Sequence, residues 1–161
     1  YRAVYKLLFL SFFILQLILP LRYLMYPGKL FWTEQGYRFS WRVMLIEKAG
    51  YAQFFIHEPL KDRKMIIENR KYLTAQQEKM MATQPDMILQ YAHFISEVYK
   101  DSIITEYNGE VINLGPKPKV TAKVEVSLFN KGSRLFIDEN IDLSNVERGF
   151  SNKKWILPYE N

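Results

Sequence analysis

A nearly unbroken apolar run lies close to the start of the chain. Residues 7–21 contain two polar positions, Ser11 and Gln16, and basic residues flank the run on both sides. As a helix this run would reach about 22 Å, which is short of the ~30 Å hydrocarbon core of a bilayer. Extension to residues 4–26 makes it long enough and adds tyrosines at both ends, where interfacial aromatic residues are typical. We therefore predict a membrane-spanning helix and its anchor in residues 1–26.

Two other interpretations fit the same run. A secretory signal peptide also has a basic end and an apolar centre, but no small-residue cleavage site follows the run here. A helix that is buried in a core or lies at the membrane interface is the second alternative. The first residue is Tyr1 rather than Met. We therefore expect upstream sequence, and expect this span to be the last one of a longer protein.

Beyond Pro27 and Gly28 the apolar residues begin to alternate with polar ones, which is typical of strands. The alternation is strict around residues 120–128, and residues 130–132 suit the tight loop of a hairpin. We expect the two strands that flank this loop to pair antiparallel. The predicted strands cover about residues 38–47, 51–57, 63–68, 119–129 and 133–137.

Two helices are predicted between these groups of strands, at about residues 75–82 and 85–100. Thr74 followed by Gln77 forms a capping box, and Pro85 suits the first position of a helix. Apolar residues at offsets of three and four give the second helix one apolar stripe. The sequence thus predicts an α+β fold: an N-terminal transmembrane or membrane-interfacial helix, then an extramembrane domain at 27–161 of antiparallel strands with two helices.

The formal net charge is +5, but Lys and Arg are mixed with Asp and Glu along the chain. No nucleic-acid-binding motif accompanies the charge, so we expect no nucleic-acid partner. Membrane lipid is the expected partner, because basic residues near a span favour anionic head groups. The absence of cysteine excludes disulfides and thiolate metal sites.

No motif for metal binding or soluble catalysis is present. His57 and His93 lack the spacing of a zinc site, so structural roles are expected for both. The acidic run at 137–142 lacks the glycine and the distal glutamate of an EF-hand loop, which favours turn and capping roles. We expect no metal. No serine lies in a nucleophile elbow, and no glycine-rich stretch matches a phosphate-binding loop.

Residues 32–42 combine aromatic and basic side chains just beyond the predicted span. They can act as interfacial anchors. Alternatively, Arg38 and Arg42, four residues apart, could bind a polar substrate against an aromatic wall.

The same residues carry a family resemblance. The stretches LPLRYLMYPGKLFWTEQGYRFSWRVML, TQPDMILQYAHF, VSLFNKGSRLFIDENIDL and WILP occur in this order between about residues 14 and 158. They resemble the carboxyl-terminal region of the vitamin K-dependent γ-glutamyl carboxylases and of the bacterial HTTM (horizontally transferred transmembrane) proteins. The resemblance implies a lyase-type membrane enzyme that couples epoxidation of vitamin K hydroquinone to carboxylation of glutamate in a protein substrate. It also places the domain after the last span on the non-cytoplasmic side.

The resemblance assigns substrate binding, not catalysis, to this part of such an enzyme. The catalytic lysine belongs to the amino-terminal membrane portion, so no catalytic residue is expected here and this part alone should be inactive. The family pattern W-T-x-x-x-Y-x-x-S-W-x-x-M implies a substrate-binding segment. Its matching residues are Trp32, Thr33, Tyr37, Ser40, Trp41 and Met44. Arg38 and Arg42, which lie at unspecified positions of this pattern, are the further polar contacts that the residues themselves suggest.

Two positions depart from the animal enzymes, which carry an acid where this chain has Arg42 and a histidine where it has Ile46. Arg42 resembles the bacterial members instead. The alternative function is therefore a non-catalytic, membrane-anchored domain that binds a partner protein or lipid.

Overall fold

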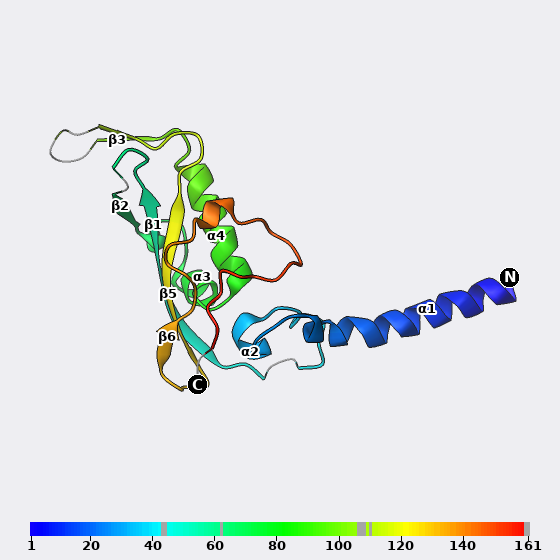
Figure 1. Cartoon of the computed structure of the whole chain (residues 1–161). Helices are drawn as coiled ribbons and strands as arrows, with labels where there is room; N and C mark the ends of the chain where they lie inside the picture. The colour runs from blue at the N-terminus through cyan, green and yellow to red at the C-terminus, as the bar shows by residue number, and fades with distance from the viewer. Residues whose placement is uncertain (43–44, 62, 106–108, 110, 160–161) are drawn as a thin grey trace. The chain divides into compact units, whose positions relative to one another are not determined.

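The computed structural model describes residues 1–161 except 43–44, 62, 106–108, 110 and 160–161 (Figure 1). The chain divides into two compact units. Unit 1 comprises Tyr1–Ile46 and Pro158–Asn161, and unit 2 comprises Glu47–Leu157. The fold is α+β, as predicted, with an N-terminal apolar helix and an antiparallel sheet.

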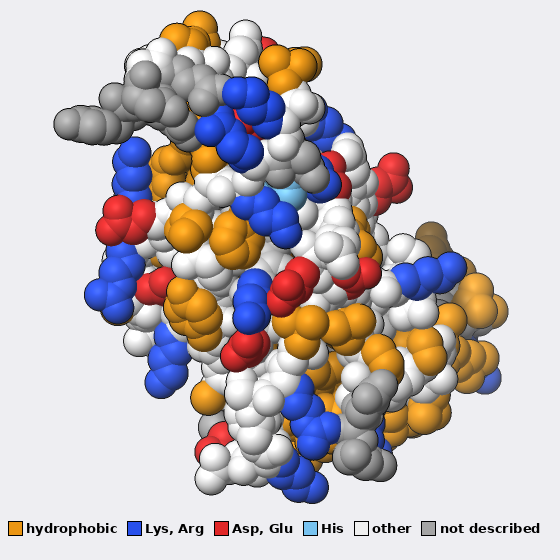
Figure 2. Space-filling model, turned by 60° about the vertical axis from the view of Figure 1, so that its left-hand side comes forward, with side chains coloured by type: hydrophobic (Ala, Val, Ile, Leu, Met, Phe, Trp, Pro, Cys, Tyr) orange, Lys and Arg blue, Asp and Glu red, His pale blue; other side chains and the backbone are white. Residues whose placement is uncertain are grey.

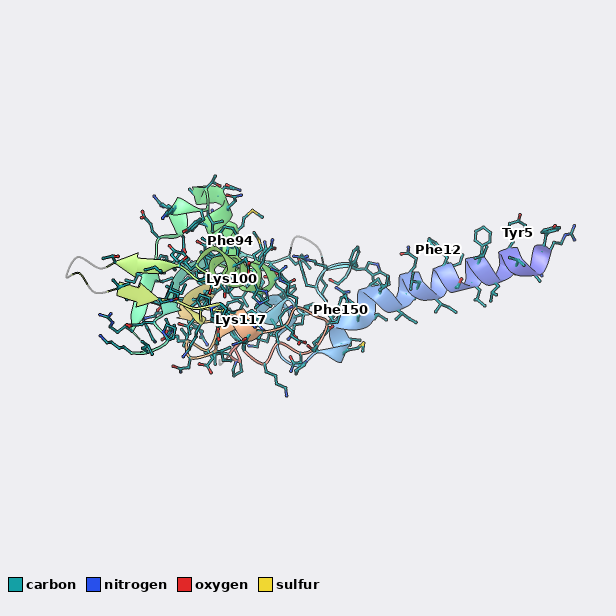
Figure 3. The ribbon with its side chains drawn as sticks, turned by 90° about the horizontal axis from the view of Figure 1, so that it is seen from above. Tyr5, Phe12, Phe94, Lys100, Lys117 and Phe150 are labelled. Carbon is teal, nitrogen blue, oxygen red and sulfur yellow. The ribbon has the colours of Figure 1, made fainter. Side chains whose placement is uncertain are left out.

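Unit 1 begins with helix α1, Arg2–Leu21, which continues into the 3₁₀ turn η1, Arg22–Met25. Together, Arg2–Met25 is long and apolar enough to cross a membrane, and at about 1.5 Å per residue it reaches roughly 36 Å. Pro20 is the one buried residue of α1, all of which is described. Side chains project on all sides of the helix, as Figure 3 shows around Tyr5 and Phe12. A helix that is apolar all round requires apolar surroundings.

The predicted strand at 38–47 is wrong for the residues that the structure describes. A short helix, α2, spans Leu30–Thr33, and turns and bends follow it up to Trp41. The backbone adopts positive φ at Glu34, Gly36 and Phe39, and the N–H of Tyr37 donates to the carbonyl of Glu34. These local turns use backbone groups that a strand would offer to a neighbour. Alternation of apolar residues was therefore misleading here.

Unit 2 is built on a four-stranded antiparallel sheet in the order β2-β1-β5-β6. The predicted strands beyond residue 50 lie in these elements, and the predicted pairing of the last two is confirmed. A separate two-stranded sheet, which the sequence pattern did not predict, pairs β3 with β4. The strands are β1 Lys48–His57, β2 Lys64–Ile67, β3 Ile103–Thr105, β4 Val111–Asn113, β5 Val120–Leu128 and β6 Ser133–Leu135.

Both predicted helices are present, as α3, Ala75–Met81, and α4, Pro85–Val98. Short 3₁₀ turns occur at η2, Asn69–Lys71, and η3, Leu143–Asn145. The Thr74 hydroxyl accepts from the Gln77 N–H and the Gln77 side chain accepts from the Thr74 N–H, so the capping box is confirmed. Pro85 lies at the start of α4, as expected.

The core of unit 2 lies between these helices and one face of the sheet. The paired residues Ala52 and Val124 lie on that face, as do Phe54 and Ala122, and all four are buried. Helix α4 contacts β5 and α3 contacts β1. Ile88 and Ile95 of α4 are fully buried. Burial of each such side chain stabilises the fold by about 1.5–3 kcal/mol.

Candidate functional site

The segment that resembles a substrate-binding region lies in unit 1, where α2 begins it. The N–H groups of Trp32 and Thr33 both donate to the carbonyl of Lys29, at 2.9 and 3.1 Å, and the helix ends at Glu34 in the left-handed conformation. Trp32 is buried, and its ring meets that of Tyr159 edge to face at 5.0 Å between centroids. Lys29 lies over the same Tyr159 ring at 4.2 Å. These contacts hold the start of the segment in place.

Gly36 brings the turn that follows α2 into contact with the backbone of η1. A Cβ at position 36 would lie 2.7 Å from the Cα of Tyr23 and 2.8 Å from its nitrogen, and the φ of Gly36 is +73°. Both the spacing and the backbone conformation therefore require glycine. This approach places η1 beside the residues that follow Gly36.

Arg42 and Tyr23 form a polar pair in this region. The guanidinium Nη2 of Arg42 donates to the Tyr23 hydroxyl at 3.3 Å, and the guanidinium carbon lies 4.9 Å from the centroid of the same ring. The backbone N–H of Arg42 donates to the hydroxyl of the buried Ser40 at 3.4 Å. Ser40 thereby supports the backbone that presents Arg42.

A cavity of about 280 Å³ opens beside this pair. Its walls combine apolar surface with hydroxyl, amide and guanidinium groups. Arg42 brings a fixed positive charge and several N–H donors, a combination suited to a carboxylate. The lining residues are Tyr23, Leu24, Tyr26, Gly28, Leu30, Thr33, Gln35 and Arg42.

Two of the residues predicted from the sequence, Thr33 and Arg42, line this cavity. Trp32, Tyr37 and Ser40 do not line it but pack within the same unit, with Tyr37 edge to face against Phe31 at 6.3 Å.

The other predicted residues lie elsewhere in unit 1. Trp41 is 70% exposed, and Arg38 is exposed as well. Neither lines the cavity. Met44 lies outside the described residues. The substrate role of all these residues stays a prediction.

The comparison with protein families confirms the family resemblance. The family model of the vitamin K-dependent gamma-carboxylase lumenal domain matches residues 1–161. The chain belongs to this family. No curated protein and no solved structure matches it.

In this gamma-carboxylase lumenal domain both histidines have structural contacts. The His57 Nε2 lies 3.0 Å from the Thr121 hydroxyl, and the His93 Nε2 lies 2.9 Å from the carbonyl of Val146. The acidic run performs the predicted turn and capping roles, since Asp138 accepts from the Asn140 N–H and Asp142 caps η3. Within the described part of the chain, no three His, Cys, Asp or Glu residues gather as a metal site would require.

Sequence reasoning missed Tyr23 and Gln35 as members of the lumenal-domain cavity. Tyr23 was assigned to the anchor of the span, and its approach to Arg42 depends on a turn that the pattern did not reveal. The close spacing of Gly36 to Tyr23 is the structural reason for the contact. An isolated glycine among aromatic residues was the available signal.

Figure 2 shows one face of the molecule, on which basic and acidic side chains are mixed.

Proposed function

We propose that this chain is the substrate-binding part of a membrane carboxylase in which unit 1 holds the glutamate side chain that is modified. The observation that carries the proposal is the cavity beside Arg42 and Tyr23 in a member of the gamma-carboxylase lumenal-domain family. A glutamate carboxylate is planar and can accept two N–H groups from one guanidinium. Arg42 would bind this carboxylate, and Thr33 and Gln35 would add polar contacts.

Binding of the carboxylate has a chemical purpose in this reaction. The γ-carbon of glutamate is only weakly acidic, because its proton lies next to a carboxylate that is already negative. An arginine at that carboxylate disperses the charge and fixes the γ-carbon relative to the reacting groups. Leu24 and Leu30 line the same cavity and would reduce the access of water.

Vitamin K hydroquinone, oxidised by oxygen, supplies the strong base in the carboxylases of this family. The side chains that line the cavity carry hydroxyl, amide and guanidinium groups, and none of these can deprotonate a hydroquinone readily. The cavity therefore does not fit the role of the hydroquinone site. We assign that site, by resemblance, to the amino-terminal membrane portion.

The apolar helix would anchor this carboxylase in the membrane. Residues 2–25 would form the last span of a bacterial, HTTM-type protein, and the domain after it would face the non-cytoplasmic side. The support is the length and apolarity of the helix together with the lumenal-domain family.

A second function is favoured by the exposed aromatic residues of unit 1. Phe39 and Trp41 are 75% and 70% exposed, and they follow the candidate span closely in the sequence. Exposed aromatic residues next to a span are typical interfacial anchors. Unit 1 would then act as an anchor, and the protein would bind a partner protein or membrane lipid without catalysis.

The decisive experiment uses membranes that contain the full-length protein. Vitamin K hydroquinone epoxidation is measured with and without a glutamate peptide and labelled bicarbonate. Epoxide formation together with label in the peptide supports the carboxylase. A folded, membrane-inserted protein that forms neither product contradicts it and favours the binding function.

A further inference from the structure

Unit 2 contains a second cavity, of about 300 Å³, which is independent of the site in unit 1. Its walls come from the segment after η2, from α3 and from α4, so one folded unit supplies the whole site. Phe94 of α4, labelled in Figure 3, is 45% exposed at this cavity. The lining residues are Tyr72, Leu73, Gln77, Met81, Met87, Gln90, Tyr91 and Phe94.

The walls of this cavity are largely apolar and include three aromatic rings. Tyr91 and Phe94 follow each other on one face of α4, with ring centroids 6.1 Å apart and an interplanar angle of 23°. The Tyr72 ring meets Phe94 edge to face at 5.6 Å. The sulfur atoms of Met81 and Met87 add polarisable surface. Aromatic faces and thioethers favour a flat, apolar ligand.

None of the described residues that line the cavity is charged, so a charged ligand would have no counter-ion among them. The nearby carboxylate of Glu78 already accepts hydrogen bonds from Asn69 and Arg70, both at 3.3 Å. A neutral ligand is therefore the better match.

Tyr91, one of the residues that line the cavity, carries a distinctive polar group. The Tyr91 side chain is 4% exposed, and its hydroxyl is buried without a hydrogen-bond partner among the described residues. The other tyrosine hydroxyls nearby are occupied, because those of Tyr72 and Tyr99 bond to each other at 3.1 Å. Buried hydroxyls without a partner are rare in native proteins. Phenylalanine would fill the same space without an unpaired group, so the hydroxyl has the capacity for a hydrogen bond to a molecule from outside the chain.

The protonation state of Tyr91 defines what that partner must offer. Burial raises the pKa of Tyr91 above its ordinary value, and the neighbouring Tyr72, Glu78 and Tyr99 raise it further. The phenol is therefore neutral at physiological pH and carries a proton that it can donate. Its partner would be a hydrogen-bond acceptor.

We propose that this cavity binds a small, neutral, ring-containing molecule whose oxygen accepts a hydrogen bond from the Tyr91 hydroxyl. The volume of about 300 Å³ suits a compound of one or two rings. The aromatic walls bind the ring, and the hydroxyl selects molecules with an acceptor oxygen over hydrocarbons of the same shape.

The experiment compares two probes that differ in the acceptor. Acetophenone has a carbonyl oxygen, and ethylbenzene has nearly the same shape without one. The full-length protein in lipid nanodiscs carries ¹³C-methyl methionine, so that the methyl signals of Met81 and Met87 report the cavity and that of Met65, on β2, serves as reference. Dissociation constants are calculated from the concentration of free ligand in the aqueous phase, so that the different partition of the two probes into lipid does not affect the comparison.

Acetophenone should shift the Met81 and Met87 signals, leave Met65 unchanged and bind at least tenfold more tightly than ethylbenzene. The Tyr91→Phe variant should lose this preference and bind both probes alike. The matched control, Tyr51→Phe, removes an exposed hydroxyl elsewhere and should keep the preference.

Three outcomes would overturn the proposal. The first is equal affinity of the wild-type protein for both probes, which would mean that the hydroxyl recognises nothing. The second is the absence of shifts at Met81 and Met87. The third is a preference that persists in Tyr91→Phe. The first two are decided on the wild-type protein alone, so they stand even if the variant fails to fold.

Discussion

Gly36 lies so close to Tyr23 that a Cβ at position 36 would stand 2.7 Å from the Tyr23 Cα. The contact joins the turn after α2 to η1 and so shapes the cavity of unit 1. It is a contact between backbones, which neither partner can relieve by rotating a side chain.

Gly36→Ala should therefore destabilise unit 1 by about 2–4 kcal/mol, because it combines a backbone clash with an unfavourable φ. Gly28→Ala is the matched control in the same unit. It has a φ of +87° but meets only the Thr33 methyl, at an ordinary 3.5 Å. The Gly28→Ala variant should lose about 1 kcal/mol of unfolding free energy. Thermal unfolding followed by tryptophan fluorescence measures the stability of both variants. An equal loss of stability in the two would show that the backbone clash at position 36 is unimportant.

Asp142 joins the start of β5 to η3 in unit 2, and its removal should lower the free energy of unfolding. Its carboxylate accepts from the Val120 N–H at 3.1 Å, from the Ser144 N–H and hydroxyl at 3.0 and 2.7 Å, and from the Asn145 side chain at 2.6 Å. We expect Asp142→Ala to lose about 2–3 kcal/mol of unfolding free energy, since the Val120 and Ser144 donors lose their acceptor.

Asp138→Ala is the control for this prediction. The Asp138 carboxylate accepts only from Asn140 among the interactions described, and these hydrogen bonds are exposed, so a loss below about 1 kcal/mol of unfolding free energy is expected. Chemical denaturation compares the two variants. If Asp142→Ala were as stable as Asp138→Ala, the carboxylate would not hold these segments together.

The buried tyrosines of unit 2 should make the fold sensitive to alkaline pH. Burial raises the pKa of Tyr99 to about 12, and its hydrogen bond with Tyr72 contributes. In the unfolded chain tyrosine ionises near pH 10. Between about pH 10 and 12 the unfolded state therefore loses its proton while the folded state keeps it, and stability falls.

Tyr99→Phe removes this contribution, so its stability should fall less steeply over that range than that of the wild-type protein. Denaturation at several pH values measures the slope, and the two proteins should have parallel profiles below about pH 9. Identical slopes above pH 10 would contradict the shifted pKa.

Local sequence signals predicted unit 2 well. The capping box at Thr74 and Gln77, the proline at the start of α4 and the alternation in β5 each depend on neighbouring residues, so they could be recognised without the fold. Strands β3 and β4 were missed because each has three residues, too few for a clear period.

The site in unit 1 was only partly predictable. The family resemblance identified Thr33, and the aromatic and basic composition of residues 32–42 identified Arg42; both line the cavity. Tyr23 joins them across a turn that the apolar alternation at 38–47 obscured, since Phe39 and Trp41 are exposed rather than on the inner face of a strand. In unit 2, no sequence pattern revealed that the Tyr91 hydroxyl would lack a partner, because this depends on the positions of Tyr72, Glu78 and Tyr99.

Peptide binding to the full-length protein in nanodiscs shows whether Arg42 binds the carboxylate of a glutamate substrate. Fluorescence anisotropy compares a labelled glutamate peptide with its glutamine counterpart. Arg42→Gln should weaken the glutamate peptide at least tenfold, about 1.4 kcal/mol, and leave the glutamine peptide nearly unchanged. The control Arg148→Gln, at an exposed arginine of unit 2, should affect neither. Unchanged binding of the glutamate peptide by Arg42→Gln would show that Arg42 does not bind the substrate carboxylate.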